Sequence, residues 1–541
     1  MNRIATGRFR IRFIQLRLRC YGICLRTRVR AQREKRGEAV VPRKVAADAE
    51  APRVSAGPAL AGWLADGKTA FAVGDTVGFR FHVSEPGEVT LHRFGDDRVD
   101  EFHKIAADAE GDVALDVVAS KPGVVSVEAK TPKGALTLAA VVAFDGIRFE
   151  YAVGDGFALR DCTNVVVRDC RVWNVGGRGF EILGGARCRV ERTEIAAIGF
   201  SGLHIVAGDR PTLTRCDHVV ADCDINDFSR TCRTYSPAGR VQGVGVTVRG
   251  CKIHNAPHAG VLYGGNDHLL EGNEICRVVQ ETSDAGAIYA GRDPTSLGNV
   301  IRGNYIHDLG KDPQFLGSKW GGFIHGVYLD DCDWGETICS NLFARCGGCA
   351  MFLCGGNLHD VYGNVVVDCA NGTGIDSRGL TWQKTSPMFR KPEGHRSWWH
   401  MKFEQGGFDW TKAPWNRYPR LAEALDGEPE LPKICPVTNN WFVACGRNHH
   451  FDKETPAITN VLPICGNHYY ADAAAALASV ARVAGRSIIV HWLGDDRVRN
   501  TLDALRESGN NEAFYLYVDA VASDQPSWLV SAAAKCRAEI A

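Results

Sequence analysis

The chain has 541 residues, and its 63 Lys and Arg residues equal its 63 Asp and Glu residues, so the formal net charge at pH 7 is zero. This length predicts two or three domains, and the balanced charge argues against a nucleic-acid partner held by bulk electrostatic attraction. No apolar run of about 18 residues is present, so the sequence predicts no transmembrane helix and no membrane partner.

The first 40 residues are rich in Arg and contain no acid before Glu34. They lack the uninterrupted apolar stretch and small-residue cleavage site of a secretory signal peptide. A transit peptide would share this composition; the alternatives are a disordered tail or a start codon assigned too far upstream. We assign residues 1–60 to a disordered tail and linker, and the sequence leaves the cellular compartment open.

Residues 61–144 contain several short segments in which apolar and polar residues alternate. Val77, Phe79 and Phe81 form one of them, and turn sequences such as "EPGE" and "KPGV" separate the segments. A period of two indicates strands with one buried face, so we expect a small β-sandwich. It would either bind carbohydrate or cap the open edge of the next domain, and we favour the cap.

Residues 145–455 carry an internal repeat. Fragments of the form apolar–x–x–(Cys/Thr/Asn)–x–apolar recur at separations as short as 22 residues, and their central residues are Cys170, Thr193, Cys223, Cys251, Asn273, Asn304, Asn341 and Asn364. A second short strand follows in most copies, and no helix-length segment intervenes. Such units are typical of a right-handed parallel β-helix, a mainly β fold in which each unit is one rung.

Identical positions stack on one another along a β-helix. Stacked Asn side chains hydrogen-bond to the rungs above and below, and a stacked thiol fills the same inward space as a small hydrophobe. The repeat therefore accounts for many of the 20 cysteines without a disulfide framework. Cys346 and Cys349 form a single CxxC pair, which is a weak indication of a metal site.

A long insertion follows Gly379, and five of the twelve Trp residues lie between Trp382 and Trp415. An aromatic loop of this length predicts a functional element. The strand pattern returns at "TNNWFVACG". Residues 456–541 then alternate between helical and strand patterns, which predicts a small α/β appendage of unknown role.

Acidic residues gather in the rungs that carry insertions, between His254 and Asp333. We take Asp284, Asp293, Asp330 and Asp331 as catalytic candidates. Counting from strand glycines such as Gly286 and Gly326 places small residues beside Asp330 and aligns four turn acids. Those acids are Asp209, Asp267, Asp293 and Asp333. The candidate substrate-binding residues are Glu281, His258, Asp267, Tyr289, Arg292, His325, Tyr328, Arg378 and Trp382.

Two carboxylates flanking a bond are what glycoside hydrolysis requires, and crowding raises one pKa so that a proton stays available. Two other interpretations remain open. The acids could accept backbone hydrogen bonds in turns, or Asp330, Asp331 and Asp333 could bind calcium; no other cofactor is expected. Asp284 and Asp330 fall at opposite ends of a strand, about 20 Å apart. They act together only if the insertion folds back; otherwise Asp293 replaces Asp284.

Six fragments in order resemble right-handed parallel β-helix proteins of bacterial polysaccharide degradation, and are most similar to glycoside hydrolase family 141 and its relatives. They are "GGNDHLLEGNEI", "ETSDAGAIYAGRD", "NVIRGNYIHDLG", "GVYLDDCDWG", "DSRGLTW" and "PWNRYPRLAEAL". The resemblance implies a secreted or periplasmic hydrolase of complex plant glycans, including those with fucose or xylose. It places the catalytic aspartates at Asp284 and at Asp330 or Asp331.

Two other functions compete with hydrolysis of a polysaccharide or oligosaccharide. A polysaccharide lyase on the same fold would need a base and a group that neutralises a uronate, for which Arg292, His325 or calcium are candidates. The chain could instead bind glycans at a surface without catalysis. "LDDC" also resembles the polygalacturonases, but their downstream Gly-His-Gly motif is missing. The oligomeric state is not predicted.

Overall fold

The computed structural model describes residues 43–45, 54–55, 60–65, 70–95, 98–107, 111–310, 323–389, 393–451 and 463–471. The expected Arg-rich tail lies almost entirely outside these residues. So does the expected α/β appendage, apart from residues 463–471. Those residues contain strands β40 (Ile464–Cys465) and β41 (His468–Tyr470), which continue the solenoid.

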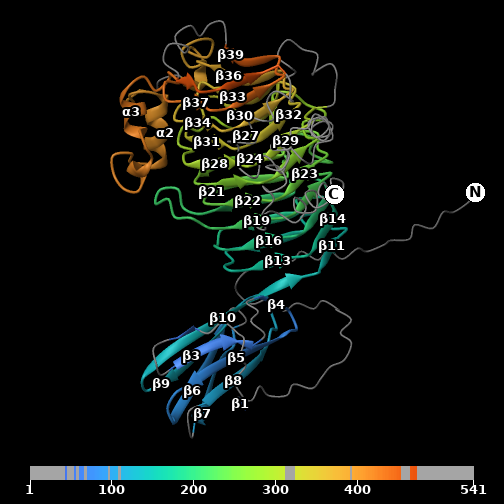
Figure 1. Ribbon diagram of the computed structural model, residues 1–541, viewed down its shortest axis with the longest axis vertical. Coiled ribbons are helices and arrows are strands. Elements are labelled where there is room, and N and C mark those ends of the chain that lie inside the picture. The colour runs from blue at the N-terminus through green and yellow to red at the C-terminus, as the bar shows by residue number, and fades with distance from the viewer. Residues whose placement is uncertain are drawn as a thin grey trace, which may run out of the picture.

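The N-terminal strands form two antiparallel sheets that pack face to face, as the alternating pattern predicts (Figure 1). One sheet contains β1 (Arg43–Val45), β8 (Gly111–Val118), β5 (Thr76–Val83), β3 (Leu60–Leu64) and β2 (Val54–Ser55). The other contains β7 (Asp100–Ala107), β6 (Gly87–Gly95), β9 (Gly123–Thr131) and the first part of β10 (Gly134–Asp145), with β4 (Ala70–Ala72) beside β10. Their shared core includes Phe79, Phe81 and Leu115, all fully buried.

Strand β10 joins the sandwich to the solenoid. Residues 134–142 pair antiparallel with β9, and Ala143 to Asp145 pair parallel with β13, in the first rung. The edge that β13 would otherwise expose is therefore covered by β10, which is how natural sheets avoid edge-to-edge association.

Each rung of the solenoid contributes one strand to each of three parallel sheets, so the predicted β-helix is confirmed. The first sheet contains β13 (Val166–Arg168), β16 (Arg189–Glu191), β19 (Val219–Ala221), β22 (Thr247–Arg249), β25 (Leu269–Glu271), β28 (Asn299–Arg302), β31 (Glu336–Cys339), β34 (Asp360–Tyr362), β37 (Val437–Thr438) and β40. The second contains β11 (Arg148–Glu150), β14 (Arg171–Val175), β17 (Glu194–Ile198), β20 (Asp224–Asn226), β23 (Lys252–His254), β26 (Glu274–Cys276), β29 (Tyr305–His307), β32 (Leu342–Ala344), β35 (Val365–Val367), β38 (Trp441–Val443) and β41. The third contains β12 (Phe157–Arg160), β15 (Phe180–Leu183), β18 (Leu203–Ala207), β21 (Gly239–Val244), β24 (Val261–Asn266), β27 (Ala285–Gly291), β30 (Ile324–Asp330), β33 (Cys349–Cys354), β36 (Asn371–Asp376) and β39 (Arg447–Phe451).

The central residue of most three-residue strands points inward and is apolar. Ile253, Ile275 and Ile306 stack in this way in the second sheet, and each is fully buried. One continuous core runs through the solenoid as a result. This stacking explains why strands of three residues suffice, because each strand is stabilised by its neighbours about 4.8 Å away.

The predicted ladder between the first and second sheets is present. Asn304 Oδ1 accepts hydrogen bonds from the backbone N–H and the Nδ2 of Asn273, each at 2.9 Å. Asn304 Nδ2 in turn donates to Asn341 Oδ1 at 2.9 Å. The same pattern continues through Asn364 to Asn440 and Asn467, which the repeat search did not include.

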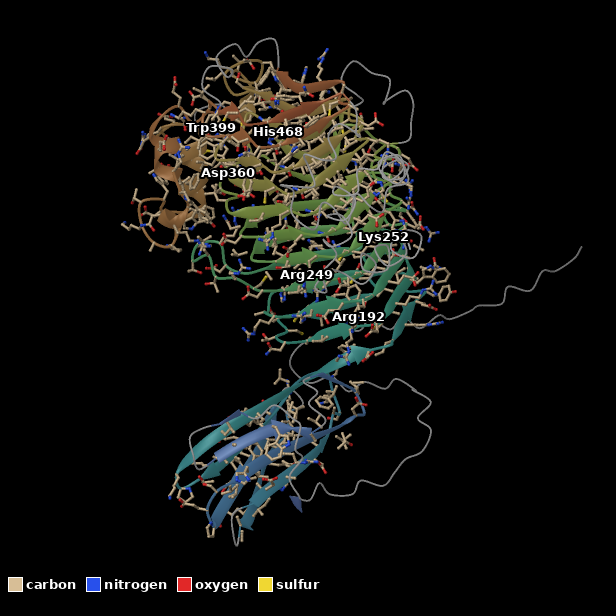
Figure 2. The ribbon with its side chains drawn as sticks, viewed as in Figure 1. Arg192, Arg249, Lys252, Asp360, Trp399 and His468 are labelled. Atoms are coloured by element: carbon tan, nitrogen blue, oxygen red, sulfur yellow. The ribbon has the colours of Figure 1, made fainter. Side chains whose placement is uncertain are left out.

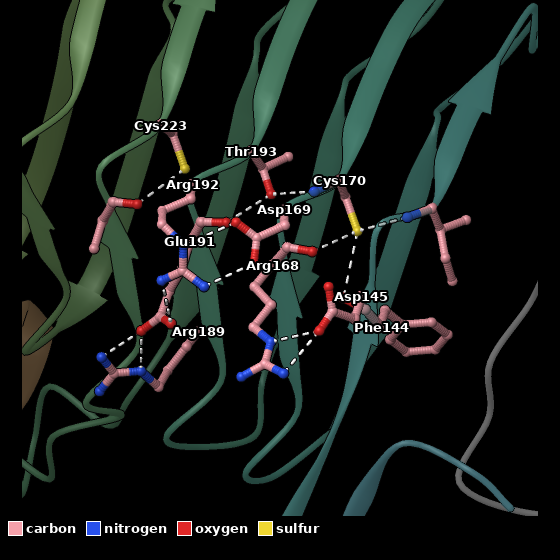
Figure 3. A network of polar contacts seen from close by, with 12 residues as sticks. Phe144, Asp145, Arg168, Asp169, Cys170, Arg189, Glu191, Arg192, Thr193 and Cys223 are labelled. Atoms are coloured by element: carbon pink, nitrogen blue, oxygen red, sulfur yellow. Dashed lines mark hydrogen bonds and ion pairs between the residues drawn. The ribbon is translucent and has the colours of Figure 1, made fainter. Parts of the chain in front are cut away.

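Figure 3 shows where the ladder begins with Cys and Thr in place of Asn. Thr193 Oγ1 accepts from the backbone N–H of Cys170 at 3.3 Å, and the Cys170 thiol donates to carbonyl oxygens. On the outside of the same rungs, Arg192 forms an ion pair with Asp169 at 2.7 Å. The buried ladder cysteines therefore act as small stacked side chains, as predicted.

One expected register was wrong. Gly286 pairs with His325, and it is Ala287 that stacks on Gly260 and on Gly326, because Ile288 pairs with Val261 and with Val327. The insertion before this rung shifts the chain by one residue, and a count from glycines cannot detect such a shift. Asp330 therefore lies beside Gly291.

The Trp-rich insertion folds into a small helical lobe at the side of the upper rungs (Figure 1). It contains 3₁₀ turns η3 (Pro387–Phe389) and η4 (Trp415–Arg417) and helices α2 (Trp398–Gly406) and α3 (Leu421–Asp426). Trp398, Trp399 and Trp415 are buried in the core that joins the lobe to Trp334 of the solenoid, and Figure 2 labels Trp399 within it. Most of these Trp residues are therefore packing residues. No described helix has the length and apolar character that crossing a bilayer would require.

Candidate active site

The guanidinium of Arg378 holds three carboxylates at the end of the third sheet. Its Nη1 donates to Asp330 Oδ1 at 2.6 Å and to Asp331 Oδ1 at 2.8 Å, and its Nη2 donates to Asp376 Oδ2 at 2.8 Å. Asp330 ends β30 and Asp376 ends β36, two rungs further on. The parallel register therefore brings together acids that are 46 residues apart in sequence.

The other contacts of Asp330 and Asp331 differ in strength. Asp331 also accepts hydrogen bonds from Arg292 Nε at 2.8 Å and Gln383 Nε2 at 2.7 Å. Among the described residues, Asp330 accepts one further side-chain hydrogen bond, from the hydroxyl of Tyr289 at 2.9 Å. Both side chains are 6% exposed. Asp331 is thus surrounded by donors that favour its charged form.

This asymmetry moves the two pKa values in opposite directions. Burial raises the pKa of Asp330, with help from the charges of Asp331 and Asp284, and Arg378 and the Tyr289 hydrogen bond offset this only in part. Burial acts in the same sense on Asp331, but its hydrogen bonds from Gln383 and Arg292 and the charge of Arg378 hold its pKa below the usual range. When all are ionised, the three carboxylates and two guanidinium groups of this cluster carry one excess negative charge.

Asp284 approaches the same cluster from the insertion before β27. Its Oδ1 accepts a hydrogen bond from the hydroxyl of Tyr328 at 2.9 Å, and the residue is exposed. Asp284 has a positive φ of 54°, so the chain turns sharply just before the strand begins. Asp284 still precedes the start of β27, whereas Asp330 pairs with Gly291 at its end, so the two acids are connected through the hydroxyl groups of Tyr328 and Tyr289.

Aromatic rings lie between the two acidic groups. The rings of Tyr289 and Tyr328 pack edge to face with centroids 5.1 Å apart, and Tyr328 stacks on Phe352 at 5.5 Å. His325 lies beneath them, 2% exposed, and accepts a hydrogen bond from the backbone N–H of Cys349 at 3.0 Å. Burial, with a smaller effect of Arg378, lowers the pKa of His325 to about 3, so the ring is neutral. His258 is also buried, and burial lowers its pKa against the opposing charge of Asp284.

The surface beside Asp330 leaves room for a ligand. Gly264 and Gly291 occupy the adjacent positions of β24 and β27, and a Cβ built on Gly264 meets no atom within 4 Å. Trp382 is 56% exposed and packs on the guanidinium of Arg378 at 5.3 Å from the ring centroid. The Arg292 side chain is 64% exposed. An aromatic face and a cation thus border a floor of small residues.

Three of the sequence candidates lie elsewhere. Asp293 accepts hydrogen bonds from Arg210 and Thr295 on the turn that follows β27. Asp267 binds Arg417 and Tyr418 of the helical lobe. Glu281 pairs with Arg233 in a cleft of about 1150 Å³ at the corner between the second and third sheets.

The acids expected to bind calcium are not gathered around one point. The positive charge between Asp330 and Asp331 is the guanidinium of Arg378. Asp333 is 1% exposed and its carboxyl lies against that of Glu336. Burial raises the pKa of both carboxyl groups in this pair; the charge of Glu336 adds to the rise at Asp333, and the charge of Asp293 adds to the rise at Glu336.

Two residues of the cluster were missed from the sequence. Asp376 ends its strand in "GTGID" as Asp330 ends its strand in "GVYLD", so the repeat itself was a usable signal. Gln383 lies at the start of the long insertion, where no spacing rule applies. Its contact with Asp331 depends on how that segment folds.

Comparison with protein families supports the architecture. Residues 238–381 match the family model described as "Right handed beta helix region". This segment contains Asp284, Asp330, Asp331 and Arg378. A search of curated proteins found none that matches the chain.

Solved structures that align with the chain include PfbA, a surface adhesin of Streptococcus pneumoniae, at 10% identity over 44% of this chain and 79% of that chain, with a TM-score of 0.29. The Dettilon tailspike protein aligns at 12% identity over 61% of this chain and 62% of its own, which is less than two thirds, with a TM-score of 0.25. The catalytic unit of a GH87 alpha-1,3-glucanase from Streptomyces thermodiastaticus aligns at 10% identity over 63% and 89%, with a TM-score of 0.18. Likeness at this level transfers no activity. None of these matches is specific to glycoside hydrolase family 141, so that resemblance stays a prediction.

Proposed function

We propose that the chain is a glycoside hydrolase that cleaves a polysaccharide or oligosaccharide at the cluster around Arg378. The proposal rests on one observation above all, that Asp330 and Asp331 share one guanidinium nitrogen of Arg378 but differ in their other hydrogen-bond donors. Glycoside hydrolysis needs one carboxyl group that keeps a proton near neutral pH and a second group that stays charged.

In this proposal Asp330 supplies the proton to the departing glycosidic oxygen. When Asp330 is protonated, its O–H can donate to the hydroxyl oxygen of Tyr289, because a phenol both donates and accepts. Asp331 stays charged and keeps Arg378 and Arg292 in place. This division explains why the chain crowds two carboxylates at the end of one strand.

Asp284 then attacks the sugar or activates a water molecule. Its carboxylate is exposed, and its described side-chain hydrogen bond comes from a neutral phenol, Tyr328. A carboxylate held by one neutral donor is more available to react than Asp331, which is held by two cations and an amide. The sugar chain would lie over Gly264 and Gly291, with one ring against Trp382.

A polysaccharide lyase is the second candidate, and the exposed guanidinium of Arg292 beside Tyr289 favours it. Such a cation would neutralise a uronate carboxylate, and a tyrosine would serve as the base. Against this, Arg292 already binds Asp331, and a pKa lowered to about 3 makes His325 a weak base. A surface protein that binds glycans without cleaving them is the third candidate.

Product analysis separates the three candidates. The full chain is incubated with a panel of neutral and acidic plant and algal polysaccharides, and both new reducing ends and ultraviolet absorbance are followed. Hydrolysis releases reducing ends without the absorbance of an unsaturated product. Absorbance that rises with the reducing ends would replace the hydrolase by a lyase. Binding without either signal would show a non-catalytic protein.

A further inference from the structure

A second group of reactive side chains lies on the outside of the second sheet, away from the acids of the third sheet. Glu274 and Cys276 are the first and last residues of β26, and His307 ends the neighbouring strand β29. The register pairs Cys276 with His307, and Ile275 and Ile306 between them point into the core. The three polar side chains therefore share the outer face.

Their donor atoms are close together. His307 Nε2 lies 3.4 Å from Glu274 Oε1, and the Cys276 sulfur lies 3.9 Å from the same oxygen. One donor atom from each of the three residues falls within 4.8 Å of the others. Zinc bonds of about 2.0–2.3 Å at tetrahedral angles separate neighbouring donors by about 3.4–3.6 Å. The three atoms need only small movements to surround a zinc ion.

The second ring nitrogen of His307 has the partner that metal-binding histidines need. His307 Nδ1 lies 2.7 Å from a carboxylate oxygen of Asp308. Arg345 holds that carboxylate with two hydrogen bonds, from Nε at 2.6 Å and from Nη2 at 2.9 Å. A carboxylate on the far nitrogen fixes the ring orientation and leaves the near nitrogen free to bind a metal.

The burial of the group also suits a metal site. Cys276 has no exposed surface, and the side chains of His307 and Glu274 are 11% and 14% exposed. A thiolate, an imidazole and a carboxylate form a set that zinc accepts, whereas calcium and magnesium prefer oxygen ligands alone. Lys252, which is labelled in Figure 2, lies on the neighbouring strand β23. Its Nζ is 3.8 Å from Glu274 Oε2.

We propose that Glu274, Cys276 and His307 bind one zinc ion, with water as the fourth ligand and Asp308 as the positioning residue. The site is independent of the proposed hydrolysis, because it lies on a different sheet. It is also distinct from the CxxC pair, because Cys346 lies in the solenoid core and Cys349 begins β33 of the third sheet.

Cobalt(II) tests the site directly, because a thiolate bound to cobalt gives a charge-transfer band. The purified full chain is stripped of metal, titrated with Co²⁺ and then challenged with Zn²⁺. We expect one equivalent of cobalt, a thiolate band and displacement by zinc. Cys276→Ser and His307→Ala should abolish the band, and Asp308→Asn should weaken binding about 10- to 100-fold. Cys232→Ser, which removes an exposed thiol elsewhere, should leave binding unchanged.

A band that persists in Cys276→Ser would overturn the proposal, and so would the lack of saturable binding. Without saturable binding, Glu274, Cys276 and His307 form a cluster of polar contacts and not a metal site. If the variants fail to fold, X-ray absorption of the zinc-loaded natural chain decides. One sulfur among nitrogen and oxygen ligands supports the site, and a shell without sulfur contradicts it.

Discussion

Asp330 and Asp331 are adjacent in the sequence and accept hydrogen bonds from the same nitrogen of Arg378, yet their pKa values move in opposite directions. The difference comes from their other neighbours. Asp331 receives further hydrogen bonds from Arg292 and Gln383, whereas in the described part of the chain Asp330 receives one, from the hydroxyl of Tyr289. Paired acids with divided protonation are typical of acid–base catalysis.

The pH profile should report this division. Because the pKa of Asp330 is raised and its protonated form is the active one, kcat/KM should fall as pH rises through that pKa. The Tyr289 hydrogen bond favours the charged form, so Tyr289→Phe should raise the pKa further and shift the alkaline limb upward by about one pH unit. Initial rates between pH 4 and pH 9 measure the shift. A limb that stays in place would remove Asp330 from the role of acid.

The surface beside Asp330 can be tested with two neighbouring glycines, Gly264 and Gly265. Gly264→Leu should leave the fold stable, because a Cβ there meets open space, but should block the substrate and raise KM. Gly265→Ala should destabilise the chain by about 1–3 kcal/mol, because Gly265 has a φ of 113° and its Cβ would lie 2.1 Å from the Gly243 carbonyl oxygen. Thermal unfolding and steady-state kinetics on both variants distinguish the effects. Unchanged kinetics in Gly264→Leu would place the substrate elsewhere.

The asparagine ladder should carry much of the stability of the solenoid. Asn304 has no exposed surface and hydrogen-bonds with the rungs on both sides. Asn304→Ala leaves several buried groups without partners, and we expect it to lower the free energy of unfolding by about 2–5 kcal/mol. Asn226→Ala, at a partly exposed position, should cost much less. Urea unfolding compares the two, and equal costs would contradict the ladder's role.

The buried pair of Asp333 and Glu336 should make stability depend on pH. Both folded pKa values are raised, so the folded state holds protons that the unfolded state has lost. The free energy of unfolding should therefore fall as pH rises above the unfolded carboxyl pKa, by about 1.4 kcal/mol per pH unit for each proton. Glu336→Gln should reduce this slope between pH 5 and pH 8, whereas the exposed Asp217→Asn should not. Identical slopes in all three proteins would contradict the raised pKa values of this pair.

The fold was predictable because each rung of a β-helix repeats the same pattern of residues in the sequence. The apolar positions and the ladder from Cys170 to Asn364 follow from the repeat spacing in the sequence, and both are present in the structure. The register of Gly286 was not predictable, because insertions alter the count by single residues while the hydrophobic pattern survives.

The candidate site could be predicted only in part for a related reason. Stacking of neighbouring rungs brings Arg378 to Asp330 and Tyr328 to Asp284, and the catalytic roles of these acids stay a prediction. Asp293 and Asp267 occupy similar turns by count, but Arg210 and Arg417 draw them into other contacts. Such ion pairs join residues that are far apart in the sequence, so the repeat does not predict them.

The most direct test of the account compares Asp330→Asn and Asp284→Asn with Asp209→Asn, an exposed acid on an earlier turn of the same solenoid. Each variant is checked for folding by circular dichroism, and turnover is measured on the best substrate of the panel. We predict that the first two variants fold normally and lose turnover by about 10²- to 10⁴-fold, while the third retains it. Natural turnover in both Asp330→Asn and Asp284→Asn would contradict the assignment of this cluster as the catalytic site.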